Sequence, residues 1–157
     1  MVRAEWAIFE EDYWAINNVL EDLLKSSRSG YVMLIDRTGQ LISQCGPDVD
    51  FDLTSFASLC AADFEANYQL AKLIGEREFS ILFHEGERDH IHISIVGRQA
   101  ILLVIFDERS SLGLVRLRVR KASSDVERVL SDIELKAQEV GHEDAESPFA
   151  EITDEDI

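Results

Sequence analysis

The sequence predicts an α/β protein of the α+β sandwich type, in which helices pack on an antiparallel sheet. Five short apolar runs have the length and composition of strands, and glycine-containing turns join several of them as hairpins. Three longer segments repeat apolar residues at helical spacing. With 157 residues, of which 46% are hydrophobic, the chain is large enough for one domain with its own core.

The N-terminal third is expected to form a helix followed by a hairpin. Apolar residues recur every three or four positions from about Phe9 to Ser26, which predicts the helix. Tyr31–Ile35 predicts a buried strand, and Leu41–Cys45 its partner. Asp36–Gly39 between them predicts a tight turn with glycine at a position of positive φ.

A long middle helix is expected to end at about Ile74, with Asp52 or Thr54 as its N-cap and Gly75 as its C-terminal stop. One apolar stripe, which should cover the sheet, contains Leu53, Ala57, Cys60, Phe64 and Ala71. A second apolar stripe contains Leu59, Ala62, Ala66, Leu70 and Leu73. Between the stripes runs a polar strip of Ser58, Glu65, Gln69, Lys72 and Glu76. The second stripe requires another surface, from this chain or from a second protomer, and we favour the second protomer.

Three further strands are expected at Glu78–Phe83, His90–Val96 and Ala100–Phe106. The second of these alternates isoleucines with polar residues, so it should have one apolar and one polar face. The third has no alternation, which indicates a central strand covered on both sides.

The last helix is expected from Leu114 to about Glu139, because apolar residues continue there at helical spacing, although Arg116–Arg120 alternates like a strand. From residue 139 onward there are eight acidic residues and no lysine or arginine. The predicted domain therefore covers residues 1–139, with its core at about 9–133, and residues 140–157 form an acidic, flexible tail.

Composition excludes several classes of partner. The formal net charge of −16 repels phosphate backbones and anionic lipid, so we expect no nucleic-acid partner. No apolar run is long enough to span a membrane, and the first residues lack the apolar stretch of a signal peptide, so the cytoplasm is the expected compartment.

The sequence contains few candidates for catalytic or metal-binding residues. His84, His90 and His92 are the candidates for a metal site, but zinc sites have tighter spacing and additional ligands, and ordinary solvent-facing polar positions explain these histidines better. No serine stands in a nucleophile elbow. We therefore expect no catalytic residue, no metal and no cofactor, and a protein that is not an enzyme.

Basic residues crowd near the start of the last helix: Arg109, Arg116, Arg118, Arg120, Lys121 and Arg128. Such a cluster is commonly a solvated helix face that pairs with nearby acids, and the functional alternative is a docking patch for an acidic partner. Arg109 follows two acidic residues in a turn, where an arginine finger is conceivable.

Three short segments of the sequence resemble the Roadblock/dynein light-chain superfamily: residues 71–76 (AKLIGE), 83–86 (FHEG) and 104–107 (VIFD). Within this superfamily the sequence is most similar to the MglB-like proteins, which are partners of MglA-type Ras-like GTPases. The resemblance covers roughly residues 9–129 and resumes at 147–152. It implies a five-stranded antiparallel sheet with the long helix on one face and the other two helices on the opposite face.

The resemblance also implies a homodimer and a partner surface. It places the dimer interface at Leu59, Ala66, Leu70, Leu73, Phe79, Ile81 and Phe83. It places the GTPase-binding face of the middle helix at Ser58, Ala61, Ala62, Glu65, Gln69 and Lys72. It implies tail anchors at Phe149 and Ile152, where Ser147 and Pro148 form a helix-start pattern that would fold on binding.

The function implied by the resemblance is stimulation of GTP hydrolysis in bacterial cell polarity or motility, with clustering at a cell pole. Such proteins reshape the switch region of the GTPase and use no arginine finger of their own. The alternative is a scaffold that tethers a partner without changing turnover. Where the family tends to have small residues, this chain has Glu65, Tyr68 and Gln69, which would clash with an MglA-type surface or mark a paralogue with another GTPase.

Overall fold

The computed structural model describes the backbone of residues 10–145 and the side chains of residues 10–139. Three helices and five strands follow one another as α1 (Glu10–Ser26), β1 (Tyr31–Asp36), β2 (Leu41–Cys45), α2 (Leu53–Leu73), β3 (Ile81–Glu85), β4 (His90–Val96), β5 (Ala100–Phe106) and α3 (Leu112–Ala145). The strands form one antiparallel sheet in the order β2-β1-β5-β4-β3. The α+β prediction is confirmed.

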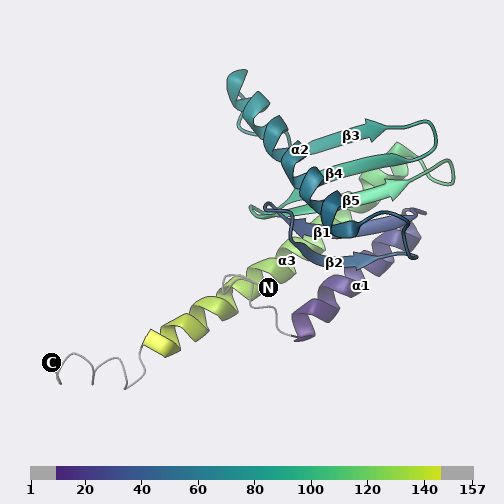
Figure 1. Ribbon diagram of the computed structural model, residues 1–157. Coiled ribbons are helices and arrows are strands. Elements are labelled where there is room, and N and C mark those ends of the chain that lie inside the picture. Colours follow the sequence, from purple (N-terminus) through teal and green to yellow (C-terminus); the bar gives the residue numbers. More distant parts are fainter. Residues whose placement is uncertain (1–9, 146–157) are drawn as a thin grey trace, which may run out of the picture.

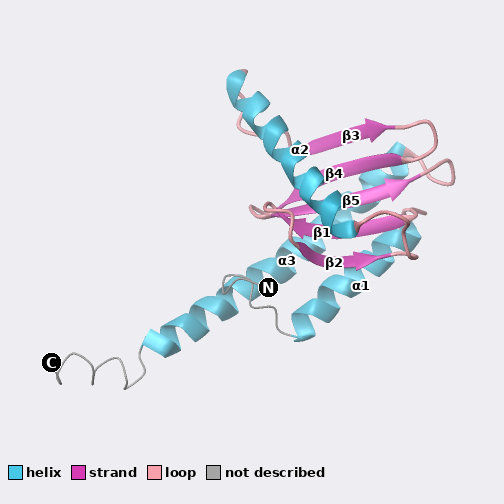
Figure 2. Ribbon diagram, in the orientation of Figure 1, coloured by secondary structure: helices cyan, strands magenta, loops and turns pink. Residues whose placement is uncertain are grey.

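Helices cover both faces of the sheet, with α2 on one side and α1 and α3 on the other (Figures 1 and 2). Alternate residues of β1 enter two separate cores, because successive side chains of a strand point to opposite faces. Met33 packs beneath α2, whereas Leu34 packs beneath α1 and α3. β5 lies at the centre of the sheet and is buried along almost its whole length, as its uninterrupted apolar sequence predicted.

Local sequence signals account for the turn between β1 and β2 and for the end of α2. The Asp36 carboxylate accepts hydrogen bonds from the backbone N–H groups of Thr38 (2.8 Å) and Gln40 (3.0 Å), and Gly39 has φ +91°. At the end of α2, Gly75 has φ +82° and its N–H donates to the carbonyl of Lys72. Both glycines stand where a left-handed backbone is required, as predicted.

Two elements, β3 and α3, have bounds that differ from the prediction by two residues or more. β3 begins at Ile81, three residues later than expected, because its ladder with β4 starts at the pair Ile81–Ser94 and Glu78 is engaged by the guanidinium of Arg37. α3 begins two residues earlier than predicted and continues to Ala145, six residues beyond its expected end. The Ser111 hydroxyl accepts a hydrogen bond from a backbone N–H in the first turn of α3, which explains the earlier start.

The predicted polar face of β4 is not exposed to solvent. Ile93 faces α2, but His92 and Ser94 are buried on the opposite face, with exposed fractions of 0% and 5%. The expectation that His92 faces solvent is therefore wrong. Alternation correctly separated the two faces of the strand, but α3 crosses the face that carries the polar residues.

Candidate functional site

The candidate site is the outer surface of α2 together with the neighbouring edge strand β3. The inward stripe of α2 is buried against the sheet, as predicted: Ala57, Cys60, Phe64 and Ala71. The outward leucines are unusually exposed, with exposed fractions of 70% for Leu59, 55% for Leu70 and 83% for Leu73. Figure 1 shows the C-terminal turns of α2 reaching past β3. A stripe of large apolar side chains that no other element of residues 10–139 covers is a candidate interaction surface.

The predicted partner strip is largely exposed. Its outward members are Ser58, Ala62, Glu65, Gln69 and Lys72. Ala61 is the exception, because its side chain points into the core beneath α2 and is only 5% exposed. Little of the Ala61 side chain is therefore available to a partner, and its contact with a partner stays a prediction. The position lies next to the buried Cys60 and Phe64 on the helix circumference, so the sheet covers it.

A cationic and aromatic cluster lies at the C-terminal end of this strip. The ring of Tyr68 has the guanidinium carbon of Arg37 at 5.6 Å and the Lys72 ammonium at 5.0 Å from its centroid. Arg37 also lies over the Phe64 ring and pairs with Glu78. A surface hollow of about 530 Å³ adjoins these groups. The spacing of Tyr68 and Lys72 signals their contact, but only the fold brings the Arg37 turn beside them.

Strand β3 forms an open edge of the sheet. It pairs with β4 on one side, and Ile81 and Phe83 remain 44% and 37% exposed. Phe79 lies before the strand rather than within it and is partly buried. On the α2 side, His84 Nε2 contacts the Asp63 carboxylate, which ties the edge strand to the helix. An open edge strand presents unpaired backbone N–H and C=O groups, which are able to pair with a strand of another chain.

Arg109 lies in the loop between β5 and α3 and is engaged within the chain. Its Nε and Nη2 atoms donate to both carboxylate oxygens of Asp107, at 3.0 to 3.2 Å. This bidentate bond raises the pKa of Arg109 and lowers the pKa of Asp107. The guanidinium is 68% exposed but is held against its own loop.

The three candidate histidines, His84, His90 and His92, are not grouped as a metal site. His84 faces α2, whereas His90 lies among the rings of Phe83 and Phe106 on the other face of the sheet. Within residues 10–139, no three histidine, cysteine or acidic side chains are grouped closely enough to hold a metal ion. The buried thiol of Cys60 has its pKa raised to about 11 by burial, so it is protonated at neutral pH.

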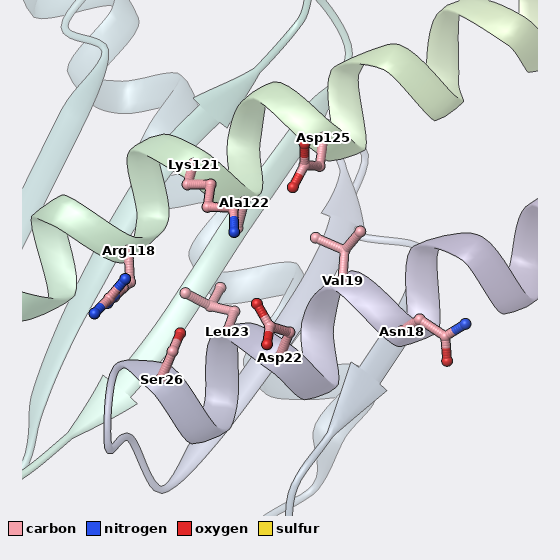
Figure 3. A pocket seen from close by; sticks show the side chains of 9 residues that line it. All are labelled: Asn18, Val19, Asp22, Leu23, Ser26, Arg118, Lys121, Ala122 and Asp125. Atoms are coloured by element: carbon pink, nitrogen blue, oxygen red, sulfur yellow. The ribbon is translucent and has the colours of Figure 1, made fainter.

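A second hollow, of about 200 Å³, lies between α1 and α3 (Figure 3). Arg118 and Lys121 enter it from α3, and Asp22 and Ser26 from α1. Its lining residues include no histidine or cysteine, and their charges balance. Nothing in it indicates a reaction.

Two expectations concern the chain ends and the membrane. The predicted tail anchors Phe149 and Ile152 lie outside the described residues. Among the helices of residues 10–145, none combines the length and hydropathy needed to cross a bilayer.

The sheet order, the three helices and the exposed α2 surface beside an open edge strand define a Roadblock-type module. Residues 15–106 match the Roadblock/LC7 domain, and the chain belongs to this family.

Three solved structures of MglB are similar to this chain. MglB from Myxococcus xanthus is 46% identical, with a TM-score of 0.76, over 81% of this chain and 96% of that protein. The gliding protein MglB from Thermus thermophilus is 30% identical, with a TM-score of 0.78, over 83% and 99%. An MglB structure with a tetrameric arrangement is also 30% identical, with a TM-score of 0.79, over 84% and 99%. An uncharacterised protein from Aquifex aeolicus is 22% identical over 142 residues.

Proposed function

We propose that this protein is a homodimeric regulator of a small Ras-like GTPase, that it stimulates GTP hydrolysis, and that it acts in a bacterial polarity or motility system. The observation that carries the proposal is the uncovered leucine stripe of α2 beside the open edge of β3, in a chain 46% identical to M. xanthus MglB. The description of the T. thermophilus relative as a gliding protein supports the cellular setting. We place the protein in the cytoplasm, clustered at a cell pole.

In the proposed dimer, two copies pair through β3 and pack their α2 helices together. The leucine stripe then becomes buried between protomers, which removes the cost of exposing it. The polar strip carrying Glu65, Gln69 and Lys72 remains outward on both helices and forms a platform for one GTPase. Glu65 and Gln69 are joined by a hydrogen bond of 2.9 Å, so they present one ordered polar surface.

The regulator supplies no catalytic group of its own in this proposal. Arg109, the candidate finger, already donates to Asp107 through two nitrogen atoms. Reaching into a GTPase site would require breaking a bidentate, charge-assisted interaction. Docking instead reshapes the switch region so that the GTPase's own arginine and glutamine reach the γ-phosphate. An arginine in cis stabilises the same developing charge as one delivered in trans.

The first test probes the platform. Glu65→Arg and Gln69→Arg should weaken binding of a Ras-like GTPase encoded beside this gene by at least about tenfold, because each places a cation at the centre of the proposed contact. The free energy of unfolding should change by less than about 0.5 kcal/mol, because both sites are exposed. Glu87→Arg makes the same charge change as Glu65→Arg, but in the exposed β3–β4 turn, and this variant should bind normally. Equal weakening by Glu87→Arg would reject α2 as the docking face.

The second test separates the possible mechanisms. Arg109→Ala should retain most of the stimulated rate in single-turnover GTP hydrolysis at saturating regulator. Loss of a true arginine finger costs about 10³-fold or more, so a collapse to the unstimulated rate at unchanged affinity would establish a finger in trans. If the wild-type protein binds the GTPase tightly but does not stimulate hydrolysis, the protein is a scaffold that tethers its partner rather than a regulator.

A further inference from the structure

A half-open cavity of about 180 Å³ lies between strands β3 and β4 and helix α3, on the face of the sheet opposite α2. We call it the β4–α3 cavity. Ile81, Ile95 and Val119 form the apolar part of its lining, and the polar part includes His92, Ser94, Arg116, Arg120 and Ser123. The space is many times the roughly 10–15 Å³ that one water molecule requires. It is therefore large enough to admit a small ligand.

The floor of this cavity contains buried polar groups without partners. His92 is 0% exposed and Ser94 is 5% exposed. Neither ring nitrogen of His92 nor the hydroxyl of Ser94 has a hydrogen-bond partner within the described part of the chain. The large majority of buried polar side chains in proteins are hydrogen-bonded, so two neighbouring exceptions indicate a missing partner at this place.

The roof of the cavity determines the charge of that partner. Arg116, Arg120 and Ser123 follow one another at intervals of four and three residues, so they share one face of α3. Both arginines are exposed at the rim, and neither forms an ion pair with another described residue. Together they disfavour a cation and favour an anion.

The protonation state of His92 is compatible with an anion in the cavity. Burial, with a smaller contribution from the Arg116 guanidinium, lowers the pKa of His92 to about 4, so the imidazole is neutral at physiological pH. A neutral imidazole still donates one hydrogen bond, and the hydroxyls of Ser94 and Ser123 supply two more donors. Hydrogen-bond donors on the floor and permanently charged guanidinium groups on the rim together match an oxygen-rich anion.

We propose that the β4–α3 cavity binds a small oxyanion, a phosphate or carboxylate group, held by Arg116 and Arg120 and by donors from His92 and Ser94. The exposed arginine side chains close over the group once it is bound. The site lies on the opposite face of the sheet from the α2 platform and does not depend on the proposed GTPase.

The test follows the imidazole Cε1–H signal of His92 by NMR, assigned by its absence in His92→Leu. The protein is titrated with inorganic phosphate and, separately, with malonate, each at ionic strength held constant with sodium chloride. A saturable shift with phosphate, malonate or both supports the site and identifies the preferred group. No saturable shift with either, or the same response to chloride alone, would mean that the cavity holds only water and would overturn the proposal.

Substitutions locate the ligand within the cavity. Arg116→Gln and Arg120→Gln should each weaken binding by about tenfold or more, because each removes a charge-assisted donor. Arg118→Gln is the matched control, since Arg118 is also exposed on α3 but lines the hollow against α1. Ser94→Ala should weaken binding without removing charge. Equal losses in the Arg118 and Arg116 variants would show nonspecific attraction to the basic helix and reject the site.

Discussion

The two faces of the sheet differ in how completely the chain covers them. On one face, α1 and α3 pack against each other and against the sheet, and Lys136 bridges Glu11 and Asp12 at 2.7 and 3.0 Å. On the other face α2 is the only helix of the described residues 10–145, and its outward leucines remain exposed. The larger core is under α1 and α3. The described chain therefore covers one face of the sheet more completely than the other, and the less covered face is the one that we propose for recognition.

The largest effect is expected from a charge on the outward surface of α2. Leu70→Glu should weaken self-association by at least about 100-fold, because a carboxylate would be buried without a partner between two α2 helices. Leu117→Glu is the control, because Leu117 on α3 is 58% exposed, close to the 55% of Leu70, but lies outside the proposed dimer interface. Analytical ultracentrifugation measures both variants. If the wild-type protein is a monomer at micromolar concentration, the proposed dimer is contradicted.

The burial of His92 on the face covered by α1 and α3 should make the free energy of unfolding depend on pH. The pKa of His92 falls from 6.5 to about 4 on folding, so the unfolded chain binds the proton more readily between these values. Stability from neutral His92 is therefore complete above pH 6.5 and is lost as pH falls towards 4, by up to roughly 3 kcal/mol. Urea unfolding in chloride buffers at pH 7 and pH 4.5 measures the change.

His92→Leu isolates this contribution, because leucine does not titrate. The variant should lose less stability than the wild type over the same interval, with the carboxylates as a common background. Identical pH dependence of the two proteins would show that His92 is not desolvated beneath α3.

The smallest effect concerns how α2 rests on the hairpin. A methyl group at Gly39 would lie 2.8 Å from the Cα of Ser58, and Gly39 has φ +91°. Gly39→Ala should therefore cost about 2 kcal/mol, from strain and from displacement of α2. Gly75→Ala has a similar φ but nothing within 4 Å, so it should cost only about 1 kcal/mol of backbone strain. Thermal unfolding measures the stability of both variants. Equal losses of stability would show that α2 does not pack closely against the turn at Gly39.

Much of this architecture follows from local sequence alone. The uninterrupted apolar run of β5 predicted a central strand, and Gly39 and Gly75 predicted the turn and the helix end. The inward stripe of α2 followed from helical periodicity. These features are predictable because backbone preference and the spacing of apolar residues act within a few positions of the chain.

The site was predictable only in part. Periodicity separated the outward leucines of α2 from the inward stripe, but it could not show that Ala61 is close enough to Cys60 and Phe64 to be covered by the sheet. The approach of Arg37 to Tyr68 was also invisible, because these residues are distant in sequence and meet only when the hairpin folds beneath α2.

The sequence by itself therefore determined the elements, their order and the residues that share a face. Only the tertiary structure decided what lies against each face. His92 and Ser94 have the alternation of solvent-facing residues, yet α3 crosses them and creates the β4–α3 cavity. The start of β3 was likewise decided by its pairing with β4. The physical reason is that periodicity reports the direction of a side chain, whereas burial depends on segments far along the chain.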